Sequence, residues 1–324
     1  SGALGKAEII PAFAAAWVVP SMVGPFLAGA VAEYLDWRWA FLGVAVLTAA
    51  AFLMIAVRLR GVDLGQGEPQ DRRALVIRLL LAVVVAVLAV VVGFSAEQPP
   101  AIGWPIAIAA VLGIGFAVLP LLPRNTLRAA AGLPSVVLMR GIVAGAFFAA
   151  EAYIPYLLMK KFDFSATWAG IALMLAALAW AGASALQGRY GERLGNHRIT
   201  VISLVALLVA LLSVLAATVL DVSALVVVLG WAFAGGGMGL LYPRLTVLTL
   251  AYSNNTNQGF NSSALSISDA TGSAVAIALA GLAVASLGGA ASAFGAVFAF
   301  CIALVACAVV PGLRLGHAAE SPTR

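Results

Sequence analysis

The chain has 324 residues, of which 63% are hydrophobic and only 10% are charged, and its mean hydropathy is +1.08. No soluble domain could hide so much apolar surface, so the composition excludes a soluble enzyme or binding module. The 18 basic residues outnumber the 13 acidic ones, but they form no basic run that would grip a nucleic acid. Apolar stretches of about 20 residues recur along the chain, which predicts an all-α polytopic membrane protein.

About ten segments are long and apolar enough to cross a bilayer as helices. We expect these spans at 9–32, 38–58, 74–96, 101–122, 134–158, 166–187, 199–219, 222–243, 258–285 and 290–312. Most lysines and arginines fall in connections on one side of the spans, which the positive-inside rule assigns to the cytoplasm. We therefore expect a multi-pass protein of the cell (plasma or inner) membrane with both termini in the cytoplasm.

The first expected span is unusual because it carries prolines and glycines inside an apolar helix. Pro20, Gly24, Pro25 and Gly29 all lie within residues 17–42. In lipid, such residues are tolerated where a neighbouring helix approaches closely and satisfies the freed backbone groups. The pattern therefore predicts a kinked helix that is packed tightly against a neighbour.

The stretch Gly24-Pro25-Phe26-Leu27-Ala28-Gly29, which leads to a Trp-Arg-Trp turn, resembles the antiporter motif of the fifth helix in the major facilitator superfamily. Ala28 stands where the family pattern has a second glycine. The order of the later segments is similar to the fourteen-helix drug:proton antiporter branch of that superfamily. The resemblance implies a major-facilitator-type helical bundle, in which close packing around this motif prevents proton leak.

That resemblance also divides the chain into three parts. Residues 1–60 would be the last two helices of the N-terminal half, 61–123 a cytoplasmic linker with two extra helices, and 124–324 the six-helix C-terminal half. The first four helices of the family would then be missing. We expect a fragment of a longer protein, and a naturally short relative is the alternative.

The connection 188–198, with the sequence GRYGERLGNHR, resembles the superfamily loop pattern G-x-L-A-D-R-x-G-R-K, with Glu192 at the usual Asp position. An acid beside the positive end of a helix, with basic residues around it, favours one closed arrangement of the helices. We therefore expect a cytoplasmic gate that consists of Gly188, Glu192, Arg193, Gly195 and Arg198. The alternative is an ordinary positive-inside loop, which explains the arginines but not the spacing of the glycines.

Charged residues inside spans are costly in lipid unless they are paired or face water, so they are candidates for function. Arg140 and Glu151 both lie in the expected helix 134–158. Their spacing of eleven residues places them about 20° apart around the helix and about 16 Å apart along it. They cannot pair directly but could face one central cavity. The alternative is that each side chain snorkels to the nearer membrane surface.

The expected helix 258–285 carries the most polar face of the chain. Side chains that recur every three or four residues form a stripe of Gln258, Ser262, Ser266, Asp269 and Ser273. Asp269 lies near the middle of the membrane, where it could take up and release a proton as a cavity changes sides. The alternative is a packing role, in which the serines hydrogen-bond to a neighbouring helix and a partner holds Asp269.

Phosphate-binding loops and paired histidines are absent from the sequence, and the two histidines, His197 and His317, lie in an expected loop and tail. We therefore expect no enzyme activity, no metal and no cofactor, with a proton gradient as the energy source.

The resemblance implies a secondary active transporter that exports small amphiphilic drug-like compounds in exchange for protons by alternating access. Its expected partners are membrane lipids, protons, a small amphiphilic molecule and the missing N-terminal helices. Two alternatives stay open: an exporter of a metabolite or lipid on the same fold, and a non-transporting membrane scaffold or sensor.

Overall fold

The computed structural model describes residues 24, 27–60, 72–220, 222–254, 256–288 and 291–315. Its long helices are α2 (Trp37–Leu59), α3 (Arg72–Ser95), α4 (Pro100–Val118), α5 (Leu133–Lys161), α6 (Ala166–Val219), α7 (Ala224–Ala251), α8 (Gln258–Ser286) and α9 (Ala291–Arg314). Short 3-10 turns lie at Leu119–Leu121 and Thr126–Arg128. Within these residues, eight helices are long and apolar enough to cross a membrane, which confirms the predicted all-α polytopic fold. Most of the expected span 9–32 lies outside the described residues.

Helix α6 contains a sharp break at Gly195. The helix has 54 residues, which would measure about 80 Å if straight, whereas the hydrocarbon core of a bilayer is about 30 Å thick. Gly195 has φ 73° and ψ 164°, a conformation that is open to glycine but strained for other residues. The predicted loop 188–198 is therefore wrong in extent, because helix continues on both sides and a single glycine interrupts it.

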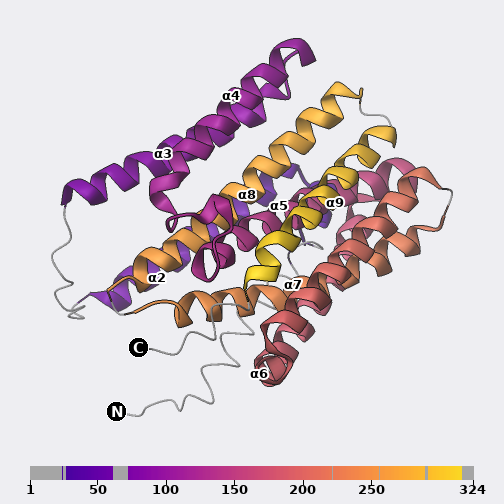
Figure 1. Ribbon diagram of the computed structural model, residues 1–324. Helices are drawn as coiled ribbons and strands as arrows, with labels where there is room; N and C mark the ends of the chain where they lie inside the picture. Colours follow the sequence, from indigo (N-terminus) through magenta and orange to yellow (C-terminus); the bar gives the residue numbers. More distant parts are fainter. Residues whose placement is uncertain are drawn as a thin grey trace.

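Both halves of α6 pack against α7, and the order of their contacts shows that the chain reverses at Gly195. The glycines of α7 and the α6 residues that they approach pair as Gly235 with Ala176, Gly239 with Trp180, Gly237 with Ser203, and Gly230 with Ser213. In the first two pairs the residue numbers of α6 and α7 increase in the same direction, so the first half of α6 runs parallel to α7. In the last two pairs they increase in opposite directions, so the second half runs antiparallel to α7. The two halves of α6 are thus the two predicted spans 166–187 and 199–219, joined as a hairpin (Figure 1).

Helix α7 continues past Pro243 to Ala251, so the predicted end of this span at residue 243 is wrong. A proline lacks the N–H that would bond the carbonyl four residues earlier, here that of Gly239. The hydroxyl of Ser184 on α6 donates to this carbonyl at 3.0 Å. Because the freed carbonyl is satisfied by a neighbouring helix, the proline does not end the helix.

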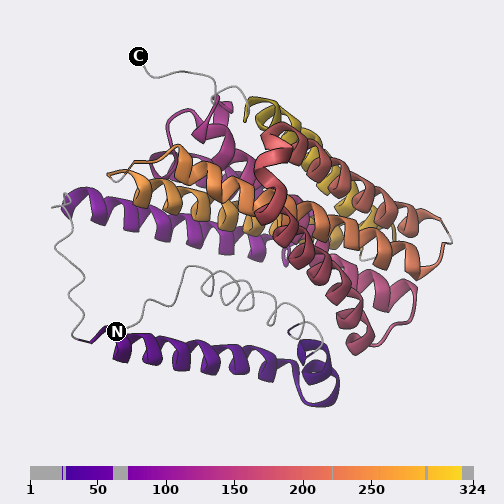
Figure 2. The same ribbon diagram turned by 90° about the horizontal axis from the view of Figure 1, so that it is seen from below.

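Helix α5 lies at the centre of a bundle with α6, α7, α8 and α9, and it is the most buried of the spans (Figures 1 and 2). Its closest neighbour is α8. A Cβ added at Gly272 of α8 would clash with the carbonyl oxygen of Gly141, and one at Gly145 would lie 2.9 Å from the carbonyl oxygen of Gly272. Ser268 of α8 donates its hydroxyl to the carbonyl of Val137 at 2.7 Å. Small residues therefore set how closely α5 and α8 approach.

The helices before α5 are more exposed. Helices α3 and α4 pair with each other and lie along α8, where the indole Nε1 of Trp104 donates to the hydroxyl of Ser286 at 3.0 Å. Figure 2 shows α2 apart from the bundle, and the side chains of its apolar window are not buried. Such apolar, exposed surfaces suit contact with lipid. The division of the chain at residues 60 and 123 stays a prediction.

Candidate functional site

Three polar side chains from three helices meet inside the bundle, and we call them the interior cluster: Arg140 of α5, Tyr242 of α7 and Asp269 of α8. The guanidinium Nε of Arg140 lies 3.3 Å from Oδ1 of Asp269, and its Nη2 donates to Oδ2 at 3.4 Å. The Tyr242 hydroxyl donates to Oδ1 of Asp269 at 2.7 Å. The Asp269 carboxylate is thus held by both a cation and a hydroxyl.

Arg140 is fixed on its other side by Tyr242. The carbon Cζ of the guanidinium lies 3.4 Å from the centre of the Tyr242 ring, in a cation–π arrangement. Its Nη1 donates to the backbone carbonyl of Tyr242 at 3.2 Å. Arg140 therefore turns toward α7 and α8 instead of snorkelling to the membrane surface.

The close crossing of α5 and α8 explains why Arg140 and Asp269 meet. Arg140 directly precedes Gly141, and Asp269 directly follows Ser268, while Gly141 and Ser268 are in contact at the crossing. A larger side chain at either contact would push the helices apart. The Asp269 carboxylate thus has partners on α5 and α7, and its role in proton handling stays a prediction.

Glu151 lies on α5 beyond the interior cluster and is half-buried. Among the described residues, no basic side chain lies within ion-pairing distance of it. The buried Nε1 of Trp231 makes no hydrogen bond to the described part of the chain. Arg140 and Glu151 do not contact each other, as the spacing predicts.

Aromatic rings fill the space between the interior cluster and Glu151. Successive ring centres along this series lie 5.0 Å apart for Tyr242 and Trp180, 5.3 Å for Trp180 and Phe147, and 4.9 Å for Phe147 and Trp231. The last two rings are stacked, with 19° between their planes. A continuous series of packed, largely buried rings from α5, α6 and α7 therefore runs from Tyr242 of the interior cluster to Trp231.

The predicted polar stripe of α8 is only partly engaged with other helices. Ser273 donates to the carbonyl of Asp269 at 2.8 Å and Ser266 to that of Ser262 at 3.3 Å, so both bond within their own helix, and Ser266 is exposed. Ser266 and Ser273 therefore do not make the bond to a neighbouring described helix that the packing alternative expects. Ser268, which lies on the α5 side of α8, makes that bond instead.

A second set of polar residues lies at one end of the bundle, and we call it the end cluster: Glu192 and Asn196 of α6 with Arg244 of α7. Nη1 of Arg244 donates to Oε1 of Glu192 at 2.6 Å, and its Nε donates to Oδ1 of Asn196 at 2.6 Å. Among the described residues, Arg244 is the one basic side chain in ion-pair contact with Glu192. The structure thus pairs Glu192 with α7.

The other residues of the expected gate have different surroundings. Arg193 and Arg198 are exposed. A Cβ at Gly188 would meet no described atom within 4 Å, whereas one at Gly191 would lie 2.7 Å from the side-chain nitrogen of Gln187. Gly195 is required by its backbone conformation. Gly188 and Gly195, the two glycines of the expected gate, therefore have different surroundings, and the gate itself stays a prediction.

The expected antiporter motif is described in part, since Pro20 and Pro25 lie outside the described residues. A Cβ at Gly29 would lie 2.7 Å from the carbonyl oxygen of Ala166, at the start of α6, whereas one at Gly24 would meet no described atom within 4 Å. One turn beyond Gly29, Oε2 of Glu33 accepts hydrogen bonds from the hydroxyl and the backbone N–H of Thr167. These bonds hold the pKa of Glu33 below its ordinary value. Among the motif residues that the structure describes, Gly29 is therefore the one with a close helix contact.

Tyr242, Arg244 and Asn196 were not foreseen from the sequence as site residues. Two of them flank a proline in the sequence Tyr242-Pro243-Arg244, and that proline predicts a helix end at this point. The spacing of small residues at 141, 145, 268 and 272 was the signal for the crossing of α5 and α8. Within the described part of the chain, no group of three or more His, Cys, Asp or Glu side chains could hold a metal ion.

Comparisons with known proteins agree with this architecture. Residues 10–229 match the family model of the Major Facilitator Superfamily. A solved structure described as an auto-inhibited POT family peptide transporter is similar in fold, with a TM-score of 0.59 and 18% identity over 98% of this chain and 71% of that one. A comparison with curated protein sequences gave no match. The family match covers well over half of the chain, which therefore belongs to the Major Facilitator Superfamily and is a multi-pass membrane transporter and not an enzyme.

Proposed function

We propose that the chain is part of a proton-coupled exporter of small amphiphilic compounds, of the drug:proton antiporter type, that works by alternating access. The observation that carries this proposal is the interior cluster, in which the carboxylate of Asp269 lies between Arg140 and Tyr242 within membrane-spanning helices. Ionisable groups at such positions are costly unless they are compensated, and they mark ion pathways in many transporters.

In the proposed cycle, a proton adds to the carboxylate of Asp269. The neutral acid no longer compensates the charge of Arg140, so the ion pair between α5 and α8 weakens. Loss of the proton to the other side of the membrane restores the pair. Because Tyr242 of α7 also contacts both groups, the change reaches three helices at once and can bias the bundle between two arrangements.

Glu151 and the aromatic rings next to it would bind the cargo. An amphiphilic compound with a positive charge suits an unpaired carboxylate beside aromatic faces, because both attract cations. The series from Tyr242 to Trp231 would bring that cargo near the proton site. In this proposal the end cluster closes the cytoplasmic side, and the N-terminal half of the transporter supplies the other wall of the pathway.

The test is dye efflux by the full-length protein reconstituted in vesicles with an imposed pH gradient, using a fluorescent cationic dye. We expect efflux that depends on the gradient, is abolished by Asp269→Asn and is weakened by Glu151→Gln. Asp163→Asn is the matched control, because Asp163 is an exposed acid in the connection before α6 and its loss should leave efflux unchanged. Efflux that ignores the gradient, or that persists fully in both interior variants, would contradict the proposal.

A further inference from the structure

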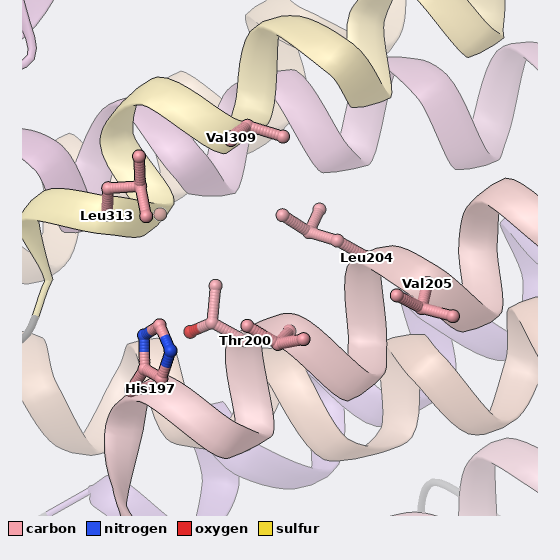
Figure 3. Close-up of a pocket in the computed structure, with 8 residues that line it drawn as sticks. His197, Thr200, Leu204, Val205, Val309 and Leu313 are labelled. Carbon is pink, nitrogen blue, oxygen red and sulfur yellow. The ribbon is translucent and has the colours of Figure 1, made fainter.

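A groove lies between the second half of α6 and the last turns of α9. Figure 3 shows the residues that line it, including His197, Thr200, Leu204, Val205, Val309 and Leu313. The cavity measures about 230 Å³. Its walls are apolar except at the end near Gly195, where the imidazole of His197 lies at the mouth (Figure 3).

The floor of the groove depends on Gly312. A Cβ at this position would lie 3.1 Å from Cγ2 of Thr200, so the glycine allows α9 and α6 to approach closely at one point. The hydroxyl of Thr200 is already bonded to the carbonyl of Asn196 at 2.9 Å and presents only its methyl group. Val205 and Val309, by contrast, are about half exposed on the rims. The groove is thus a shallow apolar channel that opens on the outer surface of the bundle.

An exposed arginine stands at the polar end of this channel. Arg198 is exposed and stands three and seven residues before the lining residues Val201 and Val205, so it projects from the same face of α6 as they do. Arg314, which follows the lining residue Leu313, is directed instead to the carbonyls of Arg128 and Ala129, at 3.0 and 2.7 Å, so Arg198 is the arginine that this face of α6 offers to a ligand. An apolar channel therefore runs into a basic mouth.

We propose that this groove binds one anionic phospholipid, with an acyl chain in the channel and the phosphate at His197 and Arg198. The channel is smaller than the pockets of roughly 300–1,000 Å³ that hold drug-sized ligands, and it suits a single flexible chain. A membrane lipid supplies both parts of the required ligand, an apolar chain and a negative headgroup at a fixed distance from it. Basic residues near a membrane surface attract anionic headgroups in this way.

The lipid would hold the second half of α6 against α9 beside the break at Gly195. This role is separate from proton or cargo handling, because the groove shares no residue with the interior cluster. It therefore stands even if the proposed transport function does not.

The test is native mass spectrometry of the full-length protein, with phosphatidylglycerol and phosphatidylcholine of identical acyl chains added in turn. We expect one phosphatidylglycerol to be retained and phosphatidylcholine to be lost. Arg198→Gln should weaken retention of phosphatidylglycerol about fivefold, the contribution of one basic residue near an anionic surface. Val309→Trp should abolish retention by filling the channel, and its exposed position on the rim tolerates a large apolar side chain in lipid.

Arg189→Gln is the matched control. It removes an arginine that also lies near the break in α6, but on the first half of the helix, where its guanidinium lies over the ring of Tyr190. It should leave retention unchanged. Three results would overturn the proposal: equal retention of the two lipids, a loss in Arg189→Gln as large as that in Arg198→Gln, or full retention in Val309→Trp. Thermal unfolding of each variant checks that it is folded, and Arg198→Gln changes only an exposed side chain.

Discussion

The interior cluster and the end cluster both depend on α7, yet they differ in how much water reaches them. Tyr242 belongs to the first and Arg244 to the second, with Pro243 between them. In the interior cluster both charged side chains are largely shielded, at 14% exposure for Arg140 and 26% for Asp269. In the end cluster Arg244 is 10% exposed, whereas Glu192 is 85% exposed.

That difference decides what each ion pair can do. A shielded charge that loses its partner stays uncompensated, so protonation of Asp269 has a large effect on the bundle. The exposed Glu192 carboxylate is solvated by water when it leaves Arg244, and the shielded Arg244 keeps its bond to Asn196, so this pair opens at a lower cost than the interior one. The interior cluster suits coupling to a proton, and the end cluster suits a gate.

The largest expected effect follows from removing one charge of the interior cluster. Asp269→Asn should lower the free energy of unfolding by about 3 kcal/mol, the lower end of the cost of breaking a buried pair, because this pair is partly exposed. Removing both charges in Arg140→Gln/Asp269→Asn should cost less than the sum of the two single changes. Thermal unfolding of the four proteins in detergent measures this coupling, and simple additivity would show that the two charges do not act as a pair.

The next effect tests whether helix packing positions the interior cluster. Gly272→Ala places a Cβ against the carbonyl of Gly141, so α5 and α8 must separate at a cost of about 1–3 kcal/mol. Gly259→Ala is the control on the same helix, since a Cβ there meets no described atom within 4 Å. We expect a clear drop in the unfolding temperature for the first variant only, together with loss of the Arg140 and Asp269 coupling. Equal behaviour of the two variants would contradict the role of the crossing.

The sequence predicted the helices far better than the contacts between them. Hydropathy located the spans because burial in lipid requires long apolar helices, whatever their neighbours are. Two predicted boundaries are wrong, at 188–198 and at residue 243, because polar residues and a proline do not end the helices there. In the structure, Arg244 pairs with Glu192, and Ser184 bonds the carbonyl freed by Pro243. Both partners are distant in sequence, so local pattern could not supply them.

The interior cluster shows the same limit. Arg140 and Asp269 stood out individually, because charges are rare within spans. Their pairing depends on the register of α5 against α8, which is set by Gly141 and Gly272 at a contact between residues far apart in the chain. Tyr242 carries no charge and did not stand out at all. A charged residue within a span can therefore be recognised from the sequence. The groups that compensate its charge can be identified only from the packing of the helices.

The smallest expected effect is at the end cluster, where salt separates its behaviour from that of the interior. Glu192→Gln should lower the free energy of unfolding by about 1 kcal/mol, because Glu192 is exposed and the shielded Arg244 keeps its bond to Asn196. High salt screens exposed charges, so the difference between wild type and Glu192→Gln should shrink from low salt to about 1 M, where the Debye length is about 3 Å. The difference for Asp269→Asn should persist, because water and ions reach that pair poorly.

Glu97→Gln, at an exposed acid in the connection between α3 and α4, controls for loss of a surface charge. If salt removed the Asp269 effect and spared that of Glu192, the assignment of a shielded coupling site and a water-exposed gate would have to be reversed.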